Sequence, residues 1–191
     1  MRNVLIIGAT GSLATVVIDQ LEKQDDVRLT LFARNKQKLT NRGKCNVIQG
    51  DAMNYDDVKN AVKGQGIVYV NLAGNLEAMT KNVVRAMQDL GVKRIIAISS
   101  IGIYNVPLKP VLIPYRKLAD IIEASGLDYT ILRPDWFTND DEINYVLTHK
   151  GEPETGTAIS RRSIAAFVTS LIEQSELHLQ ENLGISKPIT K

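Results

Sequence analysis

Residues 5–14 read LIIGATGSLA, and this stretch decides the fold. An apolar run over residues 4–7 stops at Gly8, Gly11 follows, and a stretch with helical apolar spacing comes next. A strand, a glycine-rich turn and a helix in this order are typical of the first βα turn of a dinucleotide-binding sheet. There Gly8 permits a tight turn, Gly11 lets a pyrophosphate approach the backbone, and Ala14 lets the helix pack close to the sheet.

The start of the expected helix has its own chemistry. Its first N–H groups have no acceptor inside the helix, and together with the helix dipole they attract an anion. A purely structural turn between strand and helix is the alternative. We expect a dinucleotide pyrophosphate here, bound by Gly8, Thr10, Gly11, Ser12 and Leu13.

The rest of the chain alternates between short apolar runs and stretches with helical spacing. Strands are expected over residues 4–7, 27–33, 46–49, 67–70, 94–99 and 129–132. Helices are expected over 11–22, 55–62, 76–90, 112–124 and 160–173. This alternation requires crossover connections, and it predicts an α/β fold with a single doubly wound, mostly parallel sheet, the Rossmann fold.

The length of 191 residues favours one domain. We expect a single NAD(P)-binding domain over residues 1–191. The stretch from Asp135 to Thr157 is polar and irregular. Residues 135–191 are therefore expected to contribute a small C-terminal substrate lobe.

Composition argues against several classes of protein. The net charge is only +2 with both signs mixed, so no nucleic-acid partner is expected. No apolar run is long enough to span a membrane, and the early first strand leaves no room for a signal peptide. Cys45 is the only cysteine, which favours a cytoplasmic setting. His149 and His178 are far apart in sequence without companion ligands, so no metal site is expected.

The end of the second strand bears on the choice of cofactor. NAD sites usually place a carboxylate there to accept from the ribose 2′-hydroxyl. This strand ends in Arg34, whose planar guanidinium suits a 2′-phosphate, and Lys36 and Lys38 add positive charge. We therefore favour NADP(H) over NAD(H); the alternative is that Arg34 is a solvated surface residue.

Two further strand ends belong to the same site, because ligands of open α/β sheets bind beyond the carboxyl ends of the strands. The third strand leads into QGDAM, which places Asp51 and Ala52 near the adenine. The fourth leads into VNLAG, which places Leu72, Ala73 and Gly74 beside the dinucleotide.

Several segments together resemble a known family. They are GATGSLA (8–14), ARN (33–35), GDAMN (50–54), AISS (97–100), EASGLDYTILRP (123–134) and ISRRSIAAFV (159–168). The chain resembles the atypical short-chain dehydrogenase/reductase group, in particular the small NAD(P)H-binding proteins of the NmrA-like and flavin/biliverdin reductase-like kind. The resemblance implies a Rossmann fold and NAD(P)H binding. It does not imply one reaction, because the group includes quinone, flavin and biliverdin reductases, isomerase-like enzymes and regulators that bind NADP without turnover.

The resemblance also implies where catalytic groups lie. Typical members use a Ser and a Tyr four residues before a Lys, and the Lys lowers the pKa of the proton-carrying Tyr. Ser99 and Ser100 stand where the family's serine lies. The Tyr–Lys pair is missing, because Tyr115 is followed at that distance by Ala119.

Counting back from Ser125 refines this assignment. Ten residues before the Ser of their Ser-Gly-Leu, members of the group carry a Lys or a His that holds the nicotinamide ribose, and this chain has Tyr115 there. The position expected for the catalytic Tyr holds Val111. The candidate catalytic residues are therefore Ser99, Ser100 and Tyr115, and Ser99 and Tyr115 are also expected to contact the cofactor.

Residues after the sixth strand are candidates for the substrate pocket. Pro134 is expected beside the cofactor, and Trp136 and Phe137 either line an apolar pocket above the nicotinamide or belong to the core. Tyr104 either reaches the site from its loop or caps the surface. Arg161 and Arg162 follow Ser160, the expected cap of the last helix, and they either bind an acidic substrate group or pair with Asp135.

These residues favour an NADP(H)-dependent oxidoreductase that passes hydride to a small conjugated acceptor such as a quinone or flavin, since such acceptors need little acid catalysis. The alternative is a non-catalytic NADP(H) redox sensor that acts on a protein partner or as a homodimer. A weaker alternative is an epimerase or isomerase, which the missing Tyr–Lys pair disfavours because sugar chemistry needs a proton acceptor.

Overall fold

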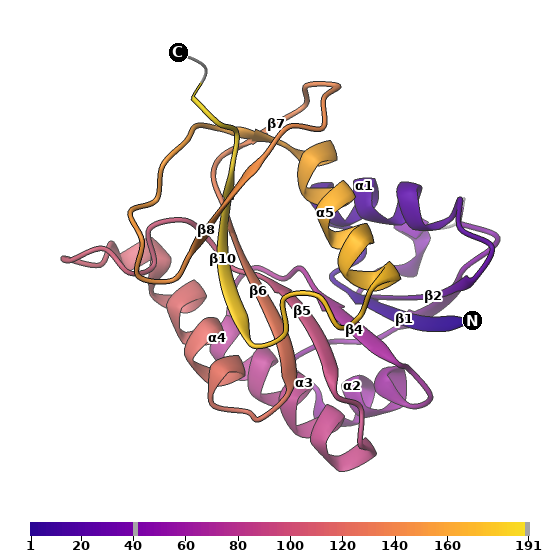
Figure 1. Ribbon diagram of the computed structural model, residues 1–191. Coiled ribbons are helices and arrows are strands. Elements are labelled where there is room, and N and C mark those ends of the chain that lie inside the picture. Colours follow the sequence, from indigo (N-terminus) through magenta and orange to yellow (C-terminus); the bar gives the residue numbers. More distant parts are fainter. Residues whose placement is uncertain (40–41, 190–191) are drawn as a thin grey trace.

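The computed structural model describes residues 1–39 and 42–189 (Figure 1). Its main sheet has eight strands in the order β3-β2-β1-β4-β5-β6-β10-β8, and every neighbouring pair is parallel except β10 with β8. The strands are β1 (Arg2–Ile7), β2 (Val27–Ala33), β3 (Asn46–Gln49), β4 (Ile67–Val70), β5 (Arg94–Ile98), β6 (Asp128–Pro134), β8 (Val146–His149) and β10 (Glu181–Ser186).

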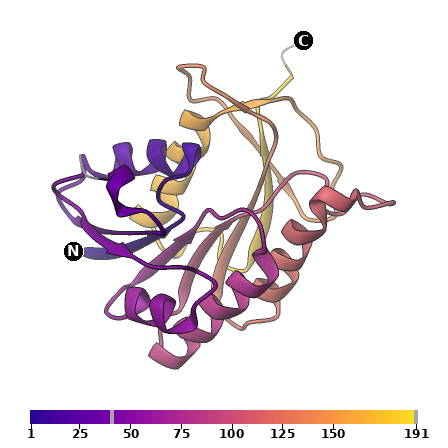
Figure 2. The ribbon, with the colours of Figure 1, turned by 180° about the vertical axis from the view of Figure 1, so that it is seen from behind.

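Helices cover both faces of this sheet, as Figures 1 and 2 show. One face carries α1 and α5 side by side, and the other carries α2, α3 and α4. Their bounds are α1 (Ser12–Leu21), α2 (Tyr55–Val62), α3 (Leu76–Leu90), α4 (Ile113–Glu123) and α5 (Arg161–Glu173). Two short 3-10 helices, Lys36–Leu39 and Pro110–Leu112, complete the connections. The predicted doubly wound α/β fold is confirmed.

The buried strand β1 shows how the sequence builds these layers. Side chains of a strand alternate between the two faces of the sheet. Val4 and Ile6 pack in the core layer beneath α1 and α5, whereas Leu5 and Ile7 pack in the layer beneath α2, α3 and α4. The unbroken apolar run is thus the signature of a strand that is covered on both faces.

Helix ends are fixed by local polar groups. The Asn54 side chain accepts hydrogen bonds from the first turn of α2, and Ser160 Oγ accepts from Ser163 N at 2.9 Å at the start of α5. Gly91 ends α3 with φ +70, in the left-handed region that favours glycine.

The C-terminal part differs from the sequence-based expectation. The stretch expected to be irregular contains β8, and a two-stranded parallel sheet pairs β7 (Phe137–Thr138) with β9 (Ile159–Ser160). Strand β10 was not expected either, yet it lies between β6 and β8 in the main sheet. Its sequence ENLGIS has polar residues at buried positions, so no apolar run marks it. The last two residues of the predicted 135–191 lobe lie outside the described residues.

Candidate functional site

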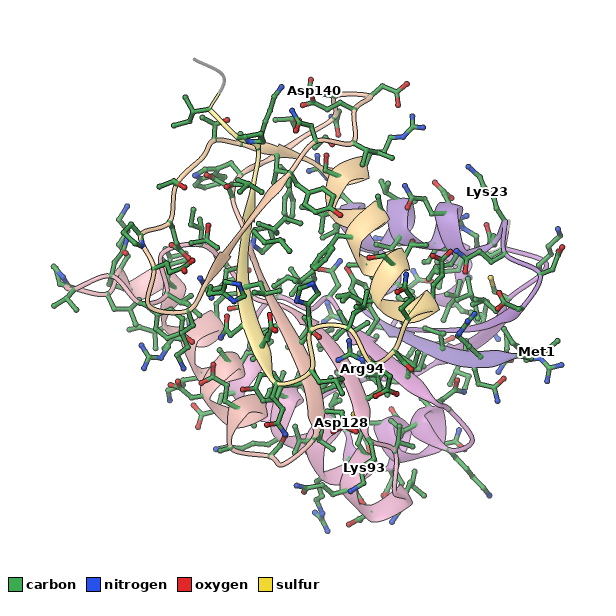
Figure 3. The ribbon with its side chains drawn as sticks, viewed as in Figure 1. Met1, Lys23, Lys93, Arg94, Asp128 and Asp140 are labelled. Atoms are coloured by element: carbon green, nitrogen blue, oxygen red, sulfur yellow. The ribbon has the colours of Figure 1, made fainter. Side chains whose placement is uncertain are left out.

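A cleft of about 1770 Å³ runs along the carboxyl ends of the strands, where the order reverses between β1 and β4. In Figure 3, Asp140 lies near this end of the molecule, and Lys93, Arg94 and Asp128 lie at the starts of β5 and β6 at the other end. The structure brings every candidate cofactor and catalytic residue to the wall of this cleft: Gly8, Thr10, Gly11, Ser12, Leu13, Arg34, Asp51, Ala52, Leu72, Ala73, Gly74, Ser99, Ser100, Tyr115 and Pro134.

The glycine turn at the middle of the cleft lies directly against Asn71, the residue after β4. Gly8 has φ +85, and a Cβ there would lie 2.1 Å from the Asn71 carbonyl oxygen. A Cβ on Gly11 would lie 3.1 Å from Asn71 Nδ2. The packing therefore requires glycine at position 8, whereas a side chain at position 11 would need the Asn71 side chain to shift by a few tenths of an ångström. Asn71 was not among the site residues expected from the sequence, although it directly precedes the expected segment Leu72–Gly74.

The first turn of α1 is open to an anion. Its N-cap, Gly11, has no capping side chain, and no acidic residue lies in the first turn. The N–H groups at this end consequently have no side-chain acceptor in the helix, and Ser12 and Leu13 line the cleft.

One end of the cleft carries positive charge from Arg34 and Lys38. Neither forms an ion pair with any carboxylate in the described part of the chain. The Asp51 carboxylate stabilises the turn after β3, because its Oδ1 accepts a hydrogen bond from Met53 N at 2.9 Å. Its own N–H donates to Asp57 Oδ2 at 2.9 Å. This end of the cleft is therefore suited to a phosphate group.

Three hydroxyl groups were candidates for catalysis, and the structure separates them. Ser99 Oγ donates to the Tyr115 carbonyl oxygen at 3.0 Å, and Ser100 Oγ donates to the Ile101 carbonyl oxygen at 3.2 Å. The Tyr115 hydroxyl makes no hydrogen bond to any described residue. Tyr115 thus has the hydroxyl that is available to a ligand.

Tyr104 lines the cleft but its hydroxyl is occupied. It donates to Glu123 Oε1 at 3.2 Å and accepts from Asn182 Nδ2 at 2.8 Å. Burial, together with the Glu123 carboxylate, raises the pKa of Tyr104. Tyr104 therefore reaches the cleft, but its hydroxyl is hydrogen-bonded to Glu123 and Asn182.

A buried ion pair forms the floor at the opposite end. Arg133, only 1% exposed, donates from Nε to Glu154 Oε1 at 2.7 Å and from Nη1 to Asn182 Oδ1 at 2.6 Å. Glu154 Oε2 accepts from Gly102 N at 2.8 Å. These bonds hold residues 151–154, which line the cleft, against the ends of β5 and β6. No local sequence signal marked Glu154.

The rim at this end carries exposed apolar side chains next to the charged Lys109, Asp135 and Glu152. Trp136 is 82% exposed and lines the cleft, as do Phe137, Val111 and Pro153. Trp136 and Phe137 are exposed, so the alternative that places them in the core is wrong. Pro134 is buried below them.

The two consecutive arginines at the start of α5 differ in their contacts. Arg162 Nη1 forms an ion pair with Asp141. Arg161 Nε donates to Ser12 Oγ at 3.2 Å. Neither pairs with Asp135, whose carboxylate accepts from Trp136 N at 2.6 Å, so that expected pairing is wrong.

Two further expectations concern residues outside the cleft. His149 and His178, distant in sequence, both lie beside Glu181, with Nδ1 to Oε2 distances of 3.7 and 2.9 Å. Among the described residues no group of three His, Cys, Asp or Glu side chains could hold a metal ion. No helix in the described ranges has the length and apolar character needed to cross a membrane.

Comparison with known proteins points to one family. The sequence profile of a family described as NAD(P)H-binding matches residues 8–175. A curated relative, the uncharacterized sugar epimerase YhfK of Bacillus subtilis (strain 168), is 25% identical over 190 residues, covering 90% of this chain and 88% of its own.

Solved structures agree with this match. A Rossmann-fold NAD(P)-binding family protein from Shigella flexneri is 45% identical, with TM-score 0.91 over 100% of this chain and 96% of its own. A short-chain dehydrogenase/reductase from Veillonella parvula DSM 2008 in complex with NADP has TM-score 0.89 at 22% identity, over 98% and 95% of the two chains. ChuY, an anaerobilin reductase from Escherichia coli O157:H7, has TM-score 0.84 at 19% identity, over 100% and 99%. The last two likenesses show a shared fold.

Proposed function

Because this chain belongs to the NAD(P)H-binding family of Rossmann-fold oxidoreductases, we propose that it is an NADPH-dependent reductase of planar conjugated acceptors such as flavins or quinones. The observation that carries this proposal is the asymmetry of the cleft: unpaired cations at one end and an exposed apolar rim around Trp136 at the other. A cytoplasmic location, expected from the lone Cys45, belongs to the same proposal.

The proposed cofactor preference rests on Arg34 and Lys38. The glycine turn and the first turn of α1 suit the pyrophosphate, and Arg34 and Lys38 would face the 2′-phosphate. The NADP complex of the Veillonella parvula protein supports this choice by analogy of fold.

In the proposed reaction the bound nicotinamide supplies a hydride, and the protein supplies orientation. The acceptor takes the hydride and one proton from water, which yields the dihydroflavin or hydroquinone. Tyr115 holds the nicotinamide ribose through its free hydroxyl. Trp136 stacks on the acceptor, and Phe137 and Pro153 exclude water from one side of it.

The acceptor proposal is tested by steady-state oxidation of NADPH with flavin mononucleotide and a small naphthoquinone as acceptors. Trp136→Ala should raise the acceptor KM about tenfold, because stacking on an aromatic side chain is worth roughly 1–3 kcal/mol per base. Ile143→Ala is the control, since Ile143 is also exposed but does not line the cleft.

Tyr115→Phe should slow turnover or weaken the binding of the cofactor.

The outcome also separates the alternatives. Tight NADPH binding with no oxidation by any acceptor would contradict the reductase and support a redox sensor, which needs a protein partner or a second copy of the chain. The description of YhfK names a sugar epimerase. Such an enzyme needs a proton acceptor at the sugar carbon. The Ser99 and Ser100 protons are committed to carbonyl oxygens and no Lys bonds the Tyr115 hydroxyl among the described residues, so we expect no epimerisation.

A further inference from the structure

Arg161 places a positive charge beside the first turn of α1 without a carboxylate to neutralise it. Its Nε donates to Ser12 Oγ at 3.2 Å, and its Nη1 donates to the Thr138 carbonyl oxygen at 3.2 Å and to Asn139 Oδ1 at 2.8 Å. All three acceptors are neutral, and no ion pair joins Arg161 to a carboxylate within the described ranges. Its neighbour Arg162, in contrast, pairs with Asp141.

This placement is unfavourable for the helices themselves. Arg161 is the first residue of α5, and a cation at a helix N-terminus opposes the helix dipole. Neither α5 nor α1 has an acidic residue in its first turn. The two helices lie side by side in Figures 1 and 2, and the Arg161–Ser12 bond joins their starting turns. The guanidinium of Arg161 therefore lies against Ser12, in the first turn of α1.

We propose that Arg161 binds the pyrophosphate of the dinucleotide. Ser12 lines the cleft next to Gly11 and Thr10, so a phosphate above this turn would lie within reach of the Arg161 guanidinium. A guanidinium binds phosphate oxygens in pairs through its planar N–H groups. The inference rests on NAD(P)H binding and adds a contact from α5 to the glycine turn and Arg34.

The same side chain joins the cofactor site to the apolar rim. Its guanidinium carbon lies 5.1 Å from the centroid of the Phe137 ring, and it bonds the two residues that follow, Thr138 and Asn139. Phe137 and Trp136 form one side of the acceptor end. A bound pyrophosphate and the rim segment Phe137–Asn139 would thus contact the same guanidinium.

The test compares Arg161→Gln with Arg162→Gln by calorimetric titration of NADPH, NADH and ADP-ribose. Arg161→Gln should weaken binding of all three by the same factor, about tenfold or more, because hydrogen bonds to charged groups contribute roughly 1.5–3 kcal/mol. Arg162→Gln should change each affinity by less than about twofold, since its charge is already paired at the surface. ADP-ribose has the pyrophosphate but no nicotinamide. A weaker affinity of Arg161→Gln for ADP-ribose therefore indicates a lost phosphate contact and not an effect on the rim.

Unchanged ADP-ribose affinity in Arg161→Gln would overturn the Arg161 contact and leave the cofactor assignment intact. Failure of the unaltered protein to bind any of the three ligands would overturn both. Arg161→Lys, which keeps the charge, should lose less affinity than Arg161→Gln; equal losses would also contradict the proposal. The Tm of each free variant is measured alongside, so that a loss of affinity caused by a less stable fold is told apart from a lost phosphate contact.

Discussion

Arg34 shows how a single residue can separate two cofactors that differ by one phosphate. It is exposed, lines the cleft and has no ion-pair partner in the described part of the chain. Its guanidinium is therefore free to bind a dianionic 2′-phosphate, whereas a free ribose hydroxyl gains little from it.

Arg34→Ala should weaken NADPH binding about tenfold or more and NADH binding by less than about twofold, because it removes a charge-assisted contact to the 2′-phosphate. Calorimetric titration of both nucleotides measures this. Lys36→Ala is the matched control, since Lys36 is exposed nearby and does not line the cleft. Equal losses for the two nucleotides would contradict the 2′-phosphate assignment.

At the scale of elements, Arg133 at the end of β6 joins the loop after β8 to the start of β10. Its partners Glu154 and Asn182 come from the loop after β8 and from β10. A charge taken out of water in this way is tolerated only while its partner remains.

Glu154→Gln should lower the free energy of unfolding by about 2–4 kcal/mol, because it leaves a buried guanidinium without its counter-charge. Glu152→Gln is the control, since Glu152 lies in the same loop but is exposed. Urea denaturation of both variants measures the difference. A loss in Glu154→Gln no larger than in Glu152→Gln would show that Arg133 finds compensation elsewhere.

Helices α3 and α4 are joined at the surface by Glu77. Lys117 of α4 and Lys81 of α3 hold the pKa of Glu77 at about 2, below its ordinary 4.5. Since the pKa is lowered by folding, the ionised carboxylate stabilises the fold above pH 4.5, and this contribution is lost as the pH falls from 4.5 to about 2.

Glu77→Gln should therefore lose stability less steeply than the unaltered protein over that pH range. The effect is expected to be small, because the pair is exposed to solvent. Urea denaturation at a series of acidic pH values measures it, and added salt should reduce the difference between the two proteins. Identical slopes at low salt would contradict a stabilising role for the ion pairs.

For the whole molecule, the cleft draws on the ends of most strands of the main sheet and on α1 and α4. A ligand that bridges these elements binds only the folded chain, and it therefore stabilises the whole sheet by mass action.

NADPH at 100 times its Kd should add about 2.7 kcal/mol to the free energy of unfolding. In a chain of this size this raises the Tm by about 5–10 °C. Thermal denaturation with and without ligand measures the shift. NADH at the same concentration should raise the Tm less, and an equal or larger rise with NADH would contradict the proposed preference for NADPH.

Local sequence patterns were sufficient to predict the strands and helices that show an apolar run or helical spacing. The expected strands and helices from β1 to β6 are all present, because apolar runs and helical spacing report burial on one or two faces directly. β10 was missed, because its buried Asn182 and Ser186 are satisfied by distant partners, Arg133 and the Thr155 carbonyl oxygen. The candidate site residues share one cleft, but their contacts with a cofactor stay predictions.

The sequence by itself determined the fold class, the glycine turn and the strand ends that line the cleft. These depend on neighbours along the chain, namely the period of apolar residues, a glycine at a turn and an uncapped helix start. Only the tertiary structure decided that the Ser99 and Tyr104 hydroxyls are hydrogen-bonded within the protein. It also decided that Arg161, and not Arg162, contacts Ser12. Those properties depend on hydrogen-bond partners far apart in sequence, such as Arg161 with Ser12, and no local pattern encodes such a pairing.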